Sequence, residues 1–82
     1  MAENVFMTEY HVIYNDEDRQ WKIKRPGATR AIRSFDNKKP AEEKAKRLAR
    51  SNRPGTVYIH YKKPGQDLKP VQNEVSYPAG DG

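Results

Sequence analysis

The sequence predicts an α+β fold: a small antiparallel sheet of three to five strands, with one helix on one face. The expected order is β-β-β-α-β, with room for one more strand at the end. Three features predict it: short stretches of aromatic and β-branched residues, Pro-Gly turns between them, and one amphipathic helix. The 82 residues, of which 34% are apolar, suffice for one domain with a small core. We expect this domain to span residues 9–77, between a disordered segment 1–8 and a flexible tail 78–82.

Three strands are expected before the helix. The first is "YHVIY" (Tyr10–Tyr14), and the second is "WKIKR" (Trp21–Arg25), which alternates apolar and cationic residues as a strand with one buried face does. Pro26 and Gly27 suit the central positions of a type II turn. The third strand, "TRAIRSF" (29–35), requires a bulge near Arg33–Ser34 if Ile32 and Phe35 are both to point inward.

The helix is the strongest local signal. Pro40 suits a first helical position, with Asn37 or Lys39 at the boundary before it, and "NRPG" (52–55) ends the helix with Asn52 near the cap. A stripe at helical spacing would face the sheet: Ala41, Ala45, Leu48 and Ala49. Beneath this stripe we expect Trp21, Ile23, Phe35, Val57 and Ile59, joined by Val12 with Tyr10 and Tyr14.

After the helix, "TVYIHY" (56–61) is expected to form a fourth strand. A turn, "KKPGQD" (62–67), and a short edge strand, "LKPV" (68–71), limited by Pro70, would follow. The chain also contains three basic-Pro-Gly tripeptides, which begin at Arg25, Arg53 and Lys63. Each falls where a turn is required, so turn formation explains them better than DNA-groove binding.

Charge is distributed unevenly along the chain. All 16 Lys and Arg residues lie between residues 19 and 69, and only four acidic residues share that segment. The segment therefore carries +12, against +5 for the whole chain. A region this positive attracts polyanions such as nucleic acid. The alternative is that these charges only keep a protein with a small core in solution.

Several function classes find no support in the sequence. There is no cysteine, no phosphate-binding Gly-rich loop and no nucleophile motif, so we expect no enzyme, no catalytic residues and no cofactor. His11 and His60 have no third partner in the sequence pattern, so a metal site is not expected. No apolar run approaches the ~20 residues of a membrane helix, and the N-terminus lacks a secretory pattern. We expect a cytoplasmic protein without membrane contact.

The second strand gives the candidate binding site. If Trp21 and Ile23 face the helix, Lys22 and Lys24 project from the opposite face of the sheet. A buried Ile32 would place Arg33 beside them, and the hairpin loop would add two more cations. The predicted nucleic-acid contacts are therefore Lys22, Lys24, Arg25, Arg30 and Arg33.

The sequence resembles a family of short uncharacterised bacterial proteins. Members of that family carry a Tyr-His-Val strand, a Trp-x-Val-Lys-Arg-x-Gly-Ala-Ser-Arg hairpin, a helix and a strand containing Val-Ile-His. The counterparts here are Tyr10–Val12, Trp21–Arg30, the helix from Pro40, and Tyr58–His60. The resemblance covers residues 10 to about 77. It implies the fold and no activity.

A second resemblance, to apetala-type and integrase N-terminal DNA-binding domains, concerns function. It rests on Trp21-x-Ile23, a turn, Arg30, Phe35-Asp36 and a helix that starts Ala41-Glu42. Those domains place the exposed face of a three-stranded sheet in the major groove of DNA, which would make Lys22, Lys24, Arg30 and Arg33 the contacts. The segment "KKPAEEKAKRLA" also resembles the last helix of double-stranded RNA-binding domains.

Two function hypotheses follow. The first is a non-enzymatic protein that binds nucleic acid, duplex DNA in preference to RNA, mainly through phosphates. The second is a protein-interaction module, such as a phage or bacterial regulator that docks on an acidic partner through a strand edge. A free edge would also allow a homodimer under either hypothesis.

Overall fold

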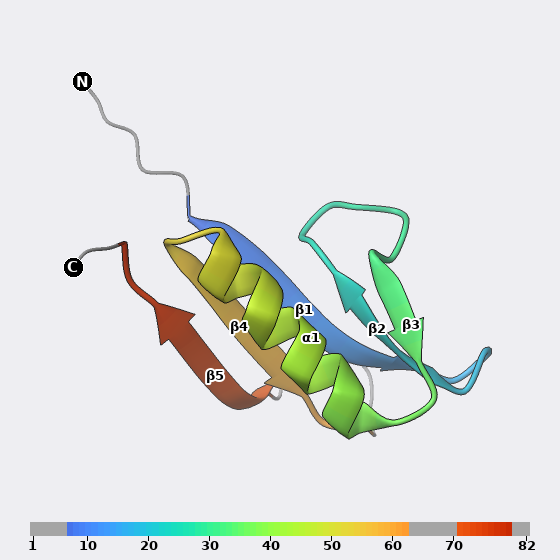
Figure 1. The fold of residues 1–82 in the computed structure, drawn as a ribbon. Helices are drawn as coiled ribbons and strands as arrows, with labels where there is room; N and C mark the ends of the chain where they lie inside the picture. Colours follow the sequence, from blue (N-terminus) through green and yellow to red (C-terminus); the bar gives the residue numbers. More distant parts are fainter. Residues whose placement is uncertain (1–6, 63–70, 80–82) are drawn as a thin grey trace.

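One helix lies across one face of a five-stranded sheet (Figure 1). The computed structural model describes residues 7–62 and 71–79. The expectations for residues 1–6, 63–70 and 80–82 lie outside the described residues. The elements are β1 (Thr8–Asn15), β2 (Gln20–Lys24), β3 (Arg33–Phe35), α1 (Lys38–Ser51), β4 (Gly55–His60) and β5 (Val71–Tyr77). This order confirms the α+β fold, and Thr8, expected in a disordered segment, opens the first strand.

The sheet is mixed rather than antiparallel. Its strand order is β3-β2-β1-β4-β5, and β1 and β4 run parallel. The way the chain connects the strands explains why β1 and β4 are parallel rather than antiparallel. Two antiparallel pairings leave β3 parallel to β1, and the crossover through α1 then brings β4 back in the direction of β3. The helix lies mainly over the central strand β1 and its neighbour β4.

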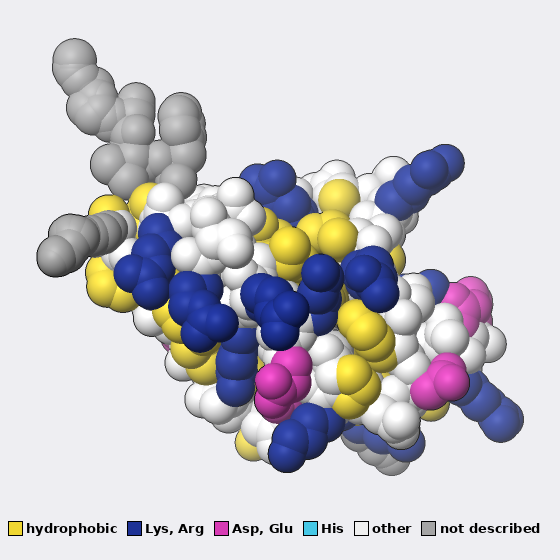
Figure 2. All heavy atoms as spheres, in the orientation of Figure 1, with side chains coloured by type: hydrophobic (Ala, Val, Ile, Leu, Met, Phe, Trp, Pro, Cys, Tyr) yellow, Lys and Arg dark blue, Asp and Glu magenta, His cyan; other side chains and the backbone are white. Residues whose placement is uncertain are grey.

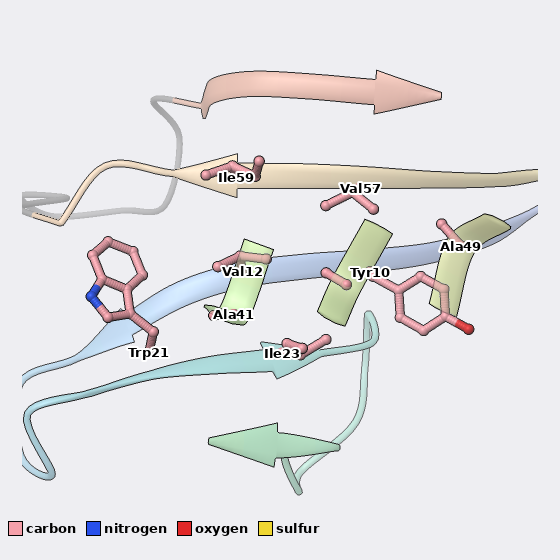
Figure 3. Close-up of a cluster of buried hydrophobic side chains, with 9 residues drawn as sticks. Tyr10, Val12, Trp21, Ile23, Ala41, Ala49, Val57 and Ile59 are labelled. Carbon is pink, nitrogen blue, oxygen red and sulfur yellow. The ribbon is translucent and has the colours of Figure 1, made fainter. Parts of the chain in front are cut away.

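The core lies between the helix and the sheet, as the alternation predicted. Val12, Ile23, Val57 and Ile59 are almost fully buried, with Tyr10 and Trp21 beside them (Figure 3). They face the buried alanines of the helix: Ala41, Ala45 and Ala49. Burial of each large side chain stabilises the fold by about 1.5–3 kcal/mol. The small alanines allow the helix to approach the sheet closely.

The third strand is shorter than predicted, so it contains Phe35 but not Ile32, and no bulge at Arg33–Ser34 is needed to point both residues inward. It begins at Arg33, so Ile32 lies outside the strand and is 41% exposed. Phe35 pairs with Trp21 and lies half-buried against the core. The expectation that Ile32 is buried is therefore wrong. The irregularity that the sheet does contain lies in β4, at Ile59/His60.

The helix starts two residues earlier than Pro40. Asn37 is the N-cap, as one of the two predicted boundaries, and Pro40 occupies the third helical position. Proline is tolerated there because the first-turn N–H groups have no acceptor within the helix. Asn52 is the C-cap, as expected: its Nδ2 donates to the Leu48 carbonyl at 2.9 Å and to the Tyr10 hydroxyl at 3.3 Å. The cap therefore ties the helix end to β1.

Gly55 is a buried strand residue rather than a turn residue. It opens β4 under the last turn of the helix and follows a cis Arg53–Pro54 peptide bond. A Cβ on Gly55 would lie 2.7 Å from the carbonyl oxygen of Ala49. This position needs glycine because the helix backbone occupies the space of a side chain.

Candidate functional site

The sheet face away from the helix, here called the open face, carries Lys22 and Lys24 as predicted. They alternate with the buried Trp21 and Ile23, and both are half-buried. The Lys22 ammonium forms an ion pair with the Asp18 carboxylate. Lys22 is therefore already partly neutralised by the protein.

The open face has little excess positive charge among the described residues. Glu9 on β1 and Glu74 on β5 share it with the two lysines. Glu9 pairs with Thr56 and Glu74 pairs with Tyr58. Thr56 and Tyr58 alternate with the core residues Val57 and Ile59, so they and their partners project to the open face. Opposite charges interspersed on one face give only a weak net potential for a polyanion. Among the described residues, the excess of positive charge is therefore not concentrated on the open face.

Arg33 lies on the opposite face from Lys22 and Lys24. It is the cross-strand partner of Ile23, and directly paired residues project to the same side of a sheet. Its guanidinium stands 5.4 Å from the centre of the Phe35 ring. The predicted grouping of Arg33 with the open-face lysines is wrong, because it depended on a buried Ile32.

The two remaining predicted contacts lie in the loop between β2 and β3, and both are exposed. Arg25 begins the expected type II turn: Gly27 has φ +79°, and the Ala28 N–H donates to the Arg25 carbonyl at 3.0 Å. Arg25 and Lys24 line one hollow on the open face. Arg30 lies in the same loop and is not among the residues that line that hollow.

Lys and Arg side chains gather on the helix side of the molecule (Figure 2). Residues 33–53 contain eight Lys or Arg and three Asp or Glu, a net charge of +5. A groove of about 380 Å³ runs between the helix and the edge strand β3. This helix–β3 groove is lined by Arg33, Phe35, Pro40, Glu43, Lys44 and Arg47.

The groove cations are not neutralised by the described part of the chain. Within residues 7–62 and 71–79, Arg33, Lys44 and Arg47 take part in no ion pair, and Glu43 is the one acidic residue that lines the groove. Cations from two elements therefore converge on one concave surface whose floor includes Phe35 and Pro40. Such a surface attracts an anionic partner.

The helix sequence predicts ion pairs for some of its cations that the described residues do not form. Glu42–Lys46 and Glu43–Arg47 have the spacing of helical ion pairs, which would neutralise these cations. In the structure Glu42 approaches Lys38 instead, at 3.9 Å. The signal that could have identified the groove is helical spacing: Pro40, Lys44 and Arg47 are four and three residues apart and therefore lie on one side of the helix.

Histidine and tyrosine side chains form a second cluster, on the open face. The Nδ1 of His11 lies 2.9 Å from the Nε2 of His60, and His11 stacks on Tyr58 with ring centres 4.9 Å apart. Burial, with Glu74 and then Glu9 nearby, raises the pKa of the Tyr58 hydroxyl. In the described part of the chain, no three His, Cys, Asp or Glu side chains lie close enough to hold a metal ion.

The described helix is too short and too polar to cross a membrane. Comparison with curated proteins and with solved structures finds no match for this chain. One protein family does match, over residues 10–66, which extends from β1 through β4 and covers well over half of the chain. The match confirms the family expected from the Tyr-His-Val strand and the Trp-containing hairpin. The chain belongs to the family of uncharacterized proteins conserved in bacteria, DUF2188.

Proposed function

We propose that this protein binds nucleic acid in the cytoplasm, without catalysis, and prefers duplex DNA to RNA. The observation that carries the proposal is the convergence of Arg33, Lys44 and Arg47 on the helix–β3 groove, where the described residues offer them no ion pair. Cations that their own protein does not neutralise are the ones that gain most from contact with phosphates.

The helix supplies further phosphate contacts beside the groove. Its outward side carries Lys39, Lys46 and Arg50, which are seven and four residues apart. A helix of 14 residues is about 21 Å long, and duplex DNA carries one phosphate charge per ~1.7 Å of its axis. The row of cations therefore spans several phosphates at once.

The preference for duplex DNA rests on groove shape. The major groove of B-DNA, about 12 Å wide, admits a helix together with its side chains. The major groove of duplex RNA is too deep and narrow for side chains to enter. Because Lys and Arg contacts to phosphates carry no sequence information, we expect weak base selectivity.

The experiment is a binding titration of duplex DNA, duplex RNA and single-stranded DNA at two salt concentrations. The proposal expects micromolar or tighter binding of duplex DNA that weakens steeply with salt. Arg33→Glu with Arg47→Glu should abolish it, and Lys22→Glu with Lys24→Glu, an equal charge change on the open face, is the control. No duplex binding at low salt, or loss only in the open-face variant, contradicts the proposal.

A second candidate function, docking on an acidic protein or on a second copy of this chain, is favoured by the sheet edge. The edge strand β5 is seven residues long, and no described strand pairs with its outer side. Such an edge can accept a strand from a partner. A salt-resistant complex that weakens in Val71→Lys, at a β5 residue that is 40% exposed, would favour this function over DNA binding, because lysine on an edge strand opposes pairing with another strand.

A further inference from the structure

A second hollow lies on the open face, away from the helix–β3 groove. The turn formed by residues 25–28 borders it on one side, and His11, Ile13 and Lys24 complete the lining. This open-face hollow has a volume of about 300 Å³. Most of its wall is apolar side chain or turn backbone, with cations from Lys24 and Arg25.

His11 is one of the residues that line the hollow. Tyr58 on β4 stacks on His11 at 4.9 Å with the ring planes 23° apart. Lys24 on β2 lies on the other side of His11, because both are its direct cross-strand neighbours. The hollow is lined by His11 and Lys24 but not by Tyr58. The stacked row of rings therefore ends at the hollow.

The orientation of the His11 ring is fixed by polar contacts on both nitrogens. Its Nδ1 lies 2.9 Å from the Nε2 of His60, which is only 4% exposed. Its Nε2 lies 3.6 Å from the Glu9 carboxylate. The His60 ring, like Tyr58, lies nearly parallel to His11, with centres 5.1 Å apart and planes 26° apart. Both rings come from β4, so the side of His11 toward Lys24 on β2 is the one left for a ligand ring.

The charges at the hollow favour an anion at one end. Lys24 and Arg25 form no ion pair with any residue in the described ranges 7–62 and 71–79. Glu9 on β1 lies 3.6 Å from the His11 Nε2 and lines a neighbouring hollow, which shares Arg25 and the rest of the 25–28 turn with this one. An acidic group would therefore be held by Lys24 and Arg25.

We propose that the open-face hollow binds a small planar aromatic anion. Its ring stacks on His11 and lies against Ile13 and Pro26, while its carboxylate or phosphate is held by Lys24 and Arg25. The volume is at the lower end for small-molecule sites, so it suits one ring system with one acidic group. The ligand extends the Tyr58–His11 stack by one ring.

The test is an amide NMR titration with adenosine 5′-monophosphate, with adenosine and inorganic phosphate as the two part-ligands. We expect saturable shifts at His11, Ile13 and Ala28, and much weaker binding of either part alone. Lys24→Gln with Arg25→Gln should weaken binding about tenfold or more. Lys39→Gln with Arg50→Gln removes the same charge from the helix and should change affinity less than twofold.

The stacking contact is tested separately from the charges. His11→Ala should weaken binding, and His11→Phe, which keeps a flat ring, should restore most of it. The proposal is overturned if no saturable shifts occur, if they fall only on the helix–β3 groove, or if the Lys24/Arg25 variant binds as the wild type does. The proposal does not rest on DNA binding: loss of the monophosphate site leaves the duplex titration unaffected, and the reverse also holds.

Discussion

The Gly55 Cα lies so close to the helix that a Cβ built on it would stand 2.7 Å from the Ala49 carbonyl oxygen and 3.0 Å from the Ala49 Cα. This approach joins the last turn of α1 to the first residue of β4.

Gly55→Ala is expected to destabilise the protein by about 1–3 kcal/mol, because the added methyl group overlaps backbone atoms that cannot move away. Chemical denaturation measures the change in the free energy of unfolding. Adding Ala49→Gly should not rescue the variant, since the nearest atoms are the backbone oxygen and Cα of Ala49 rather than its Cβ. A Gly55→Ala protein as stable as the wild type would show that the helix can shift away freely.

Substitution of Gly27 should also destabilise the protein, but for a conformational rather than a steric reason. A Cβ there would meet nothing within 4 Å, but its φ is +79°. We expect Gly27→Ala to destabilise the fold by about 1–2 kcal/mol, and Gly27→Asn to cost less, because asparagine tolerates this region better. Equal losses in both variants, measured by denaturant titration, would contradict this explanation.

Asn52→Ala should lower the free energy of unfolding by about 1–2 kcal/mol, since it removes hydrogen bonds to the Leu48 carbonyl and the Tyr10 hydroxyl. Tyr10→Phe removes only the second bond and should cost less. A double-mutant cycle measures the coupling between the two positions. A coupling energy of zero would show that the Asn52–Tyr10 bond contributes nothing.

The raised pKa of Tyr58 predicts a pH dependence at the alkaline end. The neutral phenol is favoured in the folded state, from an ordinary pKa of about 10, by burial and by the carboxylates of Glu74 and Glu9. Its contribution to stability is present below about pH 10 and is lost as the pH rises through the folded-state value. Relative to Tyr58→Phe, the wild type should become less stable above that pH. A constant difference from neutral to strongly alkaline pH would contradict the assignment.

The salt dependence of duplex binding tests the groove cations. The logarithm of the binding constant falls with the logarithm of the salt concentration, and removal of one phosphate-binding cation should make this slope shallower by roughly 0.9. Arg33→Gln with Arg47→Gln should therefore make the slope shallower by about 1.8. Lys22→Gln with Lys24→Gln should leave it nearly unchanged. A shallower slope in the Lys22/Lys24 variant alone would show that the open face, rather than the groove, binds the phosphates.

The order of elements and the core could be predicted from the sequence, because strand alternation and the alanine stripe depend on local periodicity. The placement of Arg33 could not, since it depends on where β3 begins, and hydrogen bonding to Ile23 and Trp21 decides that. The parallel pairing of β1 with β4 is likewise a consequence of connectivity.

The candidate sites were harder to predict than the fold. The open-face lysines follow from alternation, but the charges around them depend on the fold: Lys22 pairs with Asp18, and Glu74 is brought to the same face by β5, a strand distant in sequence. The helix–β3 groove requires the helix and an edge strand to be side by side. The open-face hollow requires the 25–28 turn to stand over β1, which no local pattern specifies.

The most direct test of the central claim is an NMR map of the amides that shift when a short duplex DNA is added at low salt. The proposed function predicts that the shifts gather on β3 and the outward side of α1, around Arg33, Lys44 and Arg47. Shifts confined to the open face, around Lys22 and Lys24, would contradict it.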